Sequence, residues 1–492
     1  MAFKLKLPKI NLLLIKNNKA SLILNIMNLA VSLSTISYVY YSFSRIPQII
    51  PLFYSMPWGD YQLAPKNSIQ GVLIAGLILL ITNIVISMRV QSAGNIQAGK
   101  FYSAGSFIIN LVFNLYILRI VVLTSHSELI LPVWIRIIVF PVLLAFITTL
   151  AAVPLVIKIA KKYGFMDDPL IHKHPAMLLT KPVPRAGGLA YFLGILVPAL
   201  FILPILSSQR IIGILIGAAI CVVVGLRDDK RDMSPYTRLF LQILAVFITV
   251  MSGIILVYIP NPFGEAIKLD GLKYVIDFMG EHKVYYLGVL AAVMWMWWSM
   301  NFMSFANGTD GVYAGLVSAA SIVIAVLMLG SLETDPQAAV FIKLATLSAG
   351  AGLGMAVFTW PPQKLLWGFG ATSAGLIIAA LSIVGSTKVA TTLLVLMIPF
   401  LDGMFAIIRR IRRGQMPFWG DREHLHHLLL EKFGWSKTRV AVFYWITAFL
   451  LVFVGISTQG RVRALSVATI AALVVLGISM ANIFKKARAP GQ

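Results

Sequence analysis

The sequence is poor in the residues on which soluble and secreted proteins depend. Its 492 residues include a single cysteine, Cys221, within an apolar run, so a disulfide framework is excluded. Charged residues make up only 12% of the chain, whereas 59% is hydrophobic. Because long apolar runs with so little charge are typical of membrane spans, we predict an all-α polytopic integral membrane protein and exclude a soluble one.

Acidic residues are also scarce. Eighteen Asp and Glu stand against 41 Lys and Arg, which gives a net charge of +23. Such a surplus is found in proteins that bind nucleic acid, but here the basic residues lie at the ends of the apolar runs. They therefore indicate membrane topology, and we expect no nucleic acid partner.

Fourteen apolar segments are predicted to be transmembrane helices. They centre on residues 21–43, 69–88, 105–124, 133–158, 187–206, 211–226, 238–258, 286–303, 312–330, 338–359, 371–386, 389–408, 440–457 and 464–484. The first is the weakest, since Asn25, Asn28 and several serines dilute it. We expect two domains: residues 1–130, an N-terminal extension with three segments, and residues 131–488, a membrane domain with eleven.

The distribution of Lys and Arg orients these segments. If the basic N-terminus is cytoplasmic, every second connection is cytoplasmic too, and most Lys and Arg then fall on that side. The opposite side carries the polar stretch 260–285, which we expect to be an external hairpin or a short amphipathic helix. Every polar cluster that could carry chemistry falls on the cytoplasmic side.

Two of these clusters precede or follow early segments. In residues 164–188, Lys181 could meet a phosphate, and Arg185 is followed by a glycine pair that would let backbone approach a ligand closely. In residues 225–235, Asp228 and Asp229 end an apolar segment, where both can converge on a magnesium ion. The alternatives are a plain loop with a helix cap, and carboxylates that only neutralise neighbouring basic residues.

A third cluster lies in residues 300–315. Asn301, Ser304, Asn307 and Asp310 recur at every third residue, which predicts a polar ladder along one side of a helix. Such a ladder suits the hydroxyl groups of uridine or a sugar, or a metal ion. The alternative is a polar seam between two helices.

The fourth cluster, in residues 399–430, joins a carboxylate, four arginines and three histidines. Asp402 lies seven residues before Arg409 and thus two turns deeper on the same side of a helix. An ionised carboxylate at that depth in the membrane is energetically unfavourable unless it holds a cation or pairs with Arg. The arginines attract phosphate or headgroups. The polar loop that follows carries three imidazoles suited to bind or protonate phosphoryl oxygens: His424, His426 and His427.

The order of these motifs resembles one family. Pro-Arg-x-Gly-Gly, Gly-x-x-Asp-Asp, Asn-x6-Gly-x-Asp-Gly, Leu-Asp-x6-Arg-Arg and Asp-Arg-x-His-x-His-His follow one another over about residues 133–485. This order is similar to that of the polyprenyl-phosphate N-acetylhexosamine-1-phosphate transferases. The His-Leu-His-His form is more similar to the N-acetylglucosamine branch than to the phospho-N-acetylmuramoyl-pentapeptide transferases of peptidoglycan synthesis.

The resemblance implies a Mg²⁺-dependent enzyme, with Mn²⁺ as an alternative ion, in the plasma membrane with its active site in the cytoplasm. It would transfer N-acetylhexosamine 1-phosphate from a UDP-sugar to polyprenyl phosphate, release UMP and so initiate a cell-envelope polysaccharide. The resemblance implies catalytic roles for Asp228, Asp229 and Asp402 and a metal site at Asp402 and Asp310. It implies substrate binding by Lys181, Arg185, Asn301, Asn307, Asp310, His424, His426 and His427. A homodimer is a further expectation.

Two departures from the family pattern leave alternatives open. Asn307 stands where the pattern has its first Asp, and Phe369 stands where Pro-Ala-Lys-x3-Gly-Asp has its Asp. Both losses make a non-catalytic homologue that binds the lipid carrier or the nucleotide sugar the main rival hypothesis. A transporter of the same lipid is a weaker one, because the polar clusters lie at segment ends rather than at the bilayer midplane.

Overall fold

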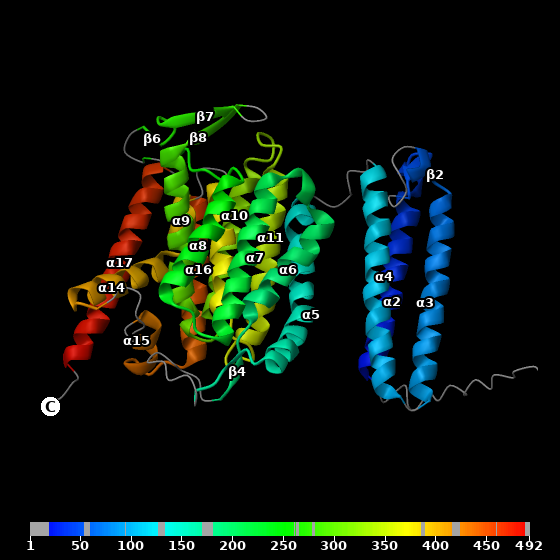
Figure 1. Cartoon of the computed structure of the whole chain (residues 1–492), viewed down its shortest axis with the longest axis horizontal. Helices are drawn as coiled ribbons and strands as arrows, with labels where there is room; N and C mark the ends of the chain where they lie inside the picture. The colour runs from blue at the N-terminus through cyan, green and yellow to red at the C-terminus, as the bar shows by residue number, and fades with distance from the viewer. Residues whose placement is uncertain are drawn as a thin grey trace, which may run out of the picture. The chain divides into compact units, whose positions relative to one another are not determined.

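The computed structural model confirms an all-α polytopic membrane protein (Figure 1). It describes residues 19–53, 60–93, 95–125, 133–169, 181–259, 261, 265–277, 281–384, 389–415, 424–458 and 460–487. Within these ranges, nine helices are long and apolar enough to cross a membrane, or ten if one bent pair is a single span. A helix lies in each of the fourteen predicted segments. However, α2 (Lys19–Ser42) is not among the helices that meet this test, and α6 (Gly187–Ile202), α8 (Pro235–Met251) and α12 (Thr372–Ile383) are shorter, so the number of spans stays a prediction.

The chain divides between Pro132 and Val133 into two units, and each is described by itself. The first unit is a three-helix group in which α4 packs on both other helices. Its elements are α2 (Lys19–Ser42), β1 (Ile49–Pro51), β2 (Leu63–Pro65), α3 (Ser68–Ser92) and α4 (Ile96–Thr124). Buried hydrogen bonds join Ser87, Gln91 and Ser103, as expected of polar glue between membrane helices.

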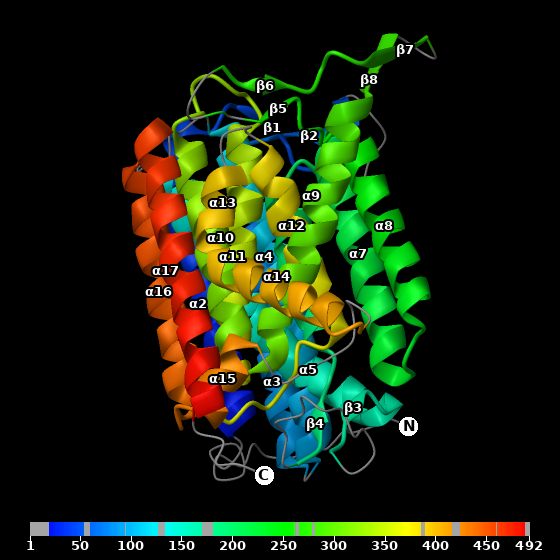
Figure 2. The ribbon, with the colours of Figure 1, turned by 90° about the vertical axis from the view of Figure 1, so that its left-hand side faces the viewer.

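The second unit is a bundle of upright helices (Figures 1 and 2). Its first half comprises α5 (Phe140–Tyr163), β3 (Met166–Asp167), β4 (Val183–Pro184), α6 (Gly187–Ile202), α7 (Gln209–Lys230), α8 (Pro235–Met251), β5 (Tyr258–Ile259), β6 (Ile267–Lys268), β7 (Lys273–Asp277) and β8 (Glu281–Tyr285). Its second half comprises α9 (Tyr286–Phe305), α10 (Val312–Leu329), α11 (Ala338–Thr359), α12 (Thr372–Ile383), α13 (Val389–Val395), α14 (Met397–Arg412), α15 (Leu425–Glu431), α16 (Lys437–Ser457) and α17 (Gly460–Ala487).

The core of the bundle is built by α10, α11 and α12. All residues of α12 are buried, and α10 packs between α11 and α16. Small residues permit this packing: a Cβ added to Gly350 of α11 would lie 2.1 Å from the carbonyl oxygen of Val142 in α5.

The polar connections gather at the two ends of this bundle. β4 and α15 lie at the lower end in Figure 1, while the strands β6, β7 and β8 lie at the upper end. The stretch 260–285 therefore forms antiparallel pairs, β5 with β6 and β7 with β8, rather than an amphipathic helix in its described part.

The predicted segment 389–408 is not one straight helix. It is broken into α13 and α14, which are bent by 77° to each other, and α14 crosses the bundle. Pro399 gives the physical reason, because a proline ring clashes with the carbonyl four residues earlier. That carbonyl belongs to Val395, the last residue of α13. The break directs Asp402 and the arginines of α14 away from the axis of α13.

Candidate functional site

Two loops at the lower end of the bundle, the one before α6 and the one after α11, form what we call the frame of the site. Residue 185 forms a β-bridge with Leu366, and Gly187 and Gly188 donate their N–H groups to the carbonyls of Leu366 and Trp367 at 2.8 and 2.9 Å. A Cβ on Gly188 would lie 2.4 Å from the carbonyl carbon of Gly370. The glycine pair that we expected to admit a ligand instead lets the α6 start pack on the loop after α11.

Asp229 lies buried at the end of α7 and is held from two sides. Arg185 Nε lies 2.8 Å from Asp229 Oδ1, and the N–H of Phe369 donates to the same oxygen at 2.9 Å. Burial lowers the pKa of the Arg185 guanidinium, but the surrounding carboxylates, with Asp229 and Asp167 the strongest, together raise it by more, so the net shift is upward and the group stays charged. Gly368 has a φ of +66°, and a Cβ there would lie 2.0 Å from Asp229 Oδ2.

Asp228 has a different set of partners. Its Oδ1 accepts from Arg238 Nε at 2.8 Å and from the N–H of Met233 at 2.9 Å. The two adjacent carboxylates therefore do not converge on one cation, contrary to the expectation from the sequence. Each has its own arginine, and these are not the neighbouring basic residues that the alternative invoked.

Arg238 is a site residue that the sequence reasoning missed. Besides Asp228, it contacts the carbonyl of Met233 at 3.0 Å, and its guanidinium carbon lies 5.4 Å from the centre of the Phe369 ring. This is cation–π distance. One feature of the sequence could have pointed to Arg238: it is the only basic residue of α8 and lies in the first turn of that helix.

Asn307 and Gly308 connect this frame to the histidines. Asn307 Nδ2 donates to the carbonyl of Gly368 at 3.2 Å. A Cβ on Gly308 would lie 2.6 Å from His426 Nε2, so this imidazole packs directly against the backbone after α9. The site thus runs from Asp229 through Gly368 and Asn307 to His426.

Asp402 closes the other end of the site. Its Oδ1 accepts from the N–H of Leu425 at 2.9 Å, and its Oδ2 lies 2.9 Å from His424 Nδ1. An ionised carboxylate only accepts, so the imidazole donates, and Nε2 is then free to accept from Arg410 Nη2 at 3.4 Å.

The three histidines are buried, and His426 and His427 lie in the short helix α15 rather than in the polar loop that we expected. His424 stacks on His426 with ring centres 5.7 Å apart, and His426 contacts His427 at 4.4 Å. The imidazoles therefore form one compact group beside Asp402.

The predicted polar ladder is not one helical face, because α9 ends at Phe305. Asp310 accepts from Lys437 Nζ at 3.0 Å and from the N–H of Gln363 at 3.3 Å. Asn301 pairs its amide with that of Gln242 in α8 at 3.2 Å, which is the helix seam left open above. Lys437 and Gln242 were missed, since only long-range packing selects them.

Some predicted residues lie apart from this arrangement or outside it. Lys181 is exposed. Residues 170–180 of the first cluster and residues 416–423 of the fourth lie outside the described residues.

The carboxylates fit a metal bound largely by substrate. In the described ranges, no group of three or more His, Cys, Asp or Glu side chains forms a ready ligand cage. Magnesium, however, is commonly held by one or two carboxylates together with substrate phosphates and waters. Each oxygen of Asp402 and each oxygen of Asp310 has one hydrogen-bond partner and keeps acceptor capacity, but one partner of Asp310 is the ammonium group of Lys437, whose charge opposes a bound cation. Asp402 is therefore the better metal ligand of the two.

Comparison with known proteins gives consistent similarities. Residues 211–386 match the model of glycosyl transferase family 4. The chain is 29% identical over 318 residues to a probable undecaprenyl-phosphate N-acetylglucosaminyl 1-phosphate transferase of Bacillus subtilis, covering 63% of this chain and 82% of the relative. It is 28% identical to a decaprenyl-phosphate N-acetylglucosaminephosphotransferase of Mycobacterium leprae, covering 56% and 73%. It is 24% identical to an undecaprenyl-phosphate alpha-N-acetylglucosaminyl 1-phosphate transferase of Escherichia coli K12, covering 61% and 78%.

The close fit of Gly368 against Asp229 predicts a specific loss of stability. We expect Gly368→Ala to lower the apparent melting temperature in detergent by several degrees, because it adds a clash worth about 1–3 kcal/mol to the backbone strain. Gly434→Ala is the matched control, since Gly434 has a φ of +64° with open space around it. Equal losses in both variants would show that only backbone strain matters.

Proposed function

Because the chain belongs to glycosyl transferase family 4, we propose that it transfers N-acetylglucosamine 1-phosphate from UDP-N-acetylglucosamine to polyprenyl phosphate and releases UMP. The names of its relatives support the acceptor and the sugar. The basic residues at the cytoplasmic segment ends support an active site on the cytoplasmic face of the plasma membrane. The product would initiate a cell-envelope polysaccharide.

One observation carries this proposal: the Asp pair and the Asp402–histidine group are parts of one contact path. Asp229 contacts the Gly368–Phe369 turn, Asn307 holds the Gly368 carbonyl, and Gly308 packs on the histidine group that binds Asp402. These segments are far apart in the sequence. Their meeting at one end of the bundle gives a donor and an acceptor a common place to react.

The proposed reaction is a displacement at phosphorus. An oxygen of polyprenyl phosphate attacks the sugar-proximal phosphorus of the UDP-sugar, the bond to the bridging oxygen breaks, and UMP leaves with that oxygen. The protein forms no covalent bond with the substrates in such a transfer, so its contribution to catalysis is mainly to position them and to neutralise their charge. The acceptor phosphate is largely ionised at neutral pH and needs only modest help from a base.

The residues divide these tasks. Arg185 and Arg238 hold the Asp pair and bring positive charge to the frame, while the Asp pair orients the acceptor. His424, His426 and His427 would bind the diphosphate oxygens. Mg²⁺, which Asp402 would hold, supplies charge neutralisation for the diphosphate when bound. We assign Asp310 to the ion pair with Lys437 rather than to metal binding.

The two missing carboxylates do not favour the non-catalytic alternative. The amide of Asn307 makes a hydrogen bond to the Gly368 carbonyl that a carboxylate, as a pure acceptor, could not make. The ring of Phe369 covers Arg238, which remains paired with Asp228. Both substituted residues thus maintain the frame of the site, which supports an active enzyme.

The first test is UMP release from UDP-N-acetylglucosamine in detergent with undecaprenyl phosphate and magnesium. We expect release that depends on the acceptor, and we expect Asp402→Asn to lower kcat by roughly 100-fold or more, as loss of a charge-stabilising group does. Asp270→Asn, an exposed acid between β6 and β7, is the control and should keep full activity. No release from any UDP-sugar by folded protein would favour a binding role.

The contact between Phe369 and Arg238 predicts a graded effect on activity. We expect Phe369→Leu to lower kcat/KM by about 3- to 10-fold, because a partly buried cation–π contact is worth roughly 1 kcal/mol. Phe369→Trp keeps an aromatic face and should stay near the wild-type value. Separate KM values for both substrates locate the effect, and equal losses in the two variants would contradict a cation–π role.

A further inference from the structure

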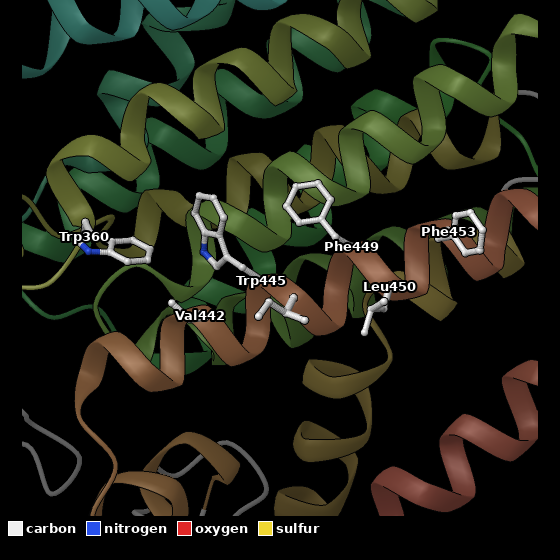
Figure 3. Close-up of a pocket in the computed structure, with 7 residues that line it drawn as sticks. Trp360, Val442, Trp445, Phe449, Leu450 and Phe453 are labelled. Atoms are coloured by element: carbon white, nitrogen blue, oxygen red, sulfur yellow. The ribbon is translucent and has the colours of Figure 1, made fainter.

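Two basic residues lie inside apolar segments of the bundle, away from the candidate site. They are Arg136, in the π-helical turn η3 (Ile135–Val139), and Lys343, in α11. The groove along α16 shows the contrast, because it is lined by Trp360 and by apolar residues from Val442 to Phe453 (Figure 3). A cation inside such a segment is unfavourable unless it has an anionic partner, so the partner of each must be identified.

Arg136 and Lys343 are neighbours in space. The hydroxyl of Thr346 in α11 contacts the carbonyl of Ile137 at 3.1 Å and that of Lys343 at 2.9 Å. One side chain thus joins the turn that carries Arg136 to the turn that carries Lys343. The charge of Arg136 also acts unfavourably on the ammonium group of Lys343. Two like charges are therefore held together by the packing of η3 on α11.

Neither cation has an acidic partner in the part of the chain that the structure describes. The ion pairs found there are made by other residues. Asp335, in the loop before α11, accepts the N–H of Gln337 at 2.9 Å instead. Arg136 Nε is buried without a hydrogen-bond partner among the described residues. Because a guanidinium stays protonated in proteins, this positive charge is permanent.

The two cations lie at the end of the bundle opposite to the candidate site. Since α5 leads from η3 down to β3 and β4, this is the upper end in Figure 1, and the predicted topology makes it the outer end. Between Phe341 and Gly352, Lys343 is the only residue of α11 that is not buried, and Arg136 is also partly exposed. A single π-helical turn is rare and frequently marks a functional site. The position is therefore accessible to a ligand.

We propose that Arg136 and Lys343 together bind the phosphate group of an anionic ligand, at a site separate from the transfer reaction proposed above. A guanidinium can hold two phosphate oxygens, and an ammonium group adds a point charge. A phosphate between the two cations would offset their repulsion and supply the acceptor that Arg136 Nε lacks. The phosphate group can belong to a lipid headgroup or to a free anion, and the experiment distinguishes these sources.

The binding test uses the full chain in neutral detergent and follows its apparent melting temperature. Dioleoylphosphatidylglycerol is titrated in one series, and inorganic phosphate at constant ionic strength in another. We expect one of them to raise the melting temperature, and Arg136→Gln to weaken its binding roughly tenfold, because one charge-assisted hydrogen bond is lost. Stabilisation by the lipid alone identifies a headgroup site, and stabilisation by inorganic phosphate identifies a free anion. Stabilisation by neither overturns the proposal.

A second variant, Lys343→Met, tests the site independently of how well Arg136→Gln folds. It removes one of the two like charges and keeps a side chain of similar length. We therefore expect it to raise the apparent melting temperature by a few degrees without added ligand, and to abolish most of the increase that the ligand gives to the wild type. A lower melting temperature without ligand, or an unchanged response to the ligand, would contradict the proposal.

Two controls separate the site from general charge effects and from an internal ion pair. Arg210→Gln removes an exposed basic residue at the start of α7, at the same end of the bundle, and should leave the response to the ligand unchanged. Glu128 precedes Arg136 in the sequence and lies outside the described residues, and Glu128→Gln should also leave the response unchanged. The proposal is overturned by an equal loss of response in Arg210→Gln. It is also overturned if Glu128→Gln and Arg136→Gln destabilise the protein equally while the response to the ligand stays intact.

Discussion

The site depends on two buried carboxylates that each require a cation. Asp228 and Asp229 lie at the end of a membrane helix, where an unpaired charge would be strongly unfavourable. Arg185 lies between β4 and α6, and Arg238 lies in the first turn of α8. Pairing each acid with an arginine from a different segment fixes both segments on the end of α7. The same pairing places two guanidinium groups beside the acids, where a phosphate substrate needs positive charge.

This pairing requires that backbones approach closely. A Cβ on Gly225 of α7 would lie 2.3 Å from the N atom of Gly370, and one on Gly188 would meet the same residue. Because all three positions are glycine, the turn after α11 lies directly on α6 and α7. Only this contact allows the N–H of Phe369 to reach Asp229. The ion pairs and the glycines are therefore two parts of one packing solution.

The sequence predicted the helices well and the partners poorly, for a physical reason. A membrane helix is marked by a local apolar run, and a helix formed in each such run. The break at Val395 could not be predicted from Pro399 alone, since Pro154 and Pro198 lie inside α5 and α6 without ending them. Whether Asn301 contacts a substrate or Gln242, and whether Asp310 meets a metal or Lys437, is decided by packing between distant segments. The motifs mark segments that meet at the candidate site, but the ion pairs came only from the structure.

The side chain and the backbone of residue 369 act separately. The N–H that binds Asp229 is present for any residue except proline, so the loss of the family's carboxylate leaves the hold on Asp229 intact. The side chain faces Arg238, a residue already paired with Asp228. A carboxylate there would share this cation with Asp228 and draw it from the frame, whereas an aromatic face holds it without adding charge. Phenylalanine thus leaves the net charge around Arg238 more positive, which suits the anionic acceptor of the proposed reaction.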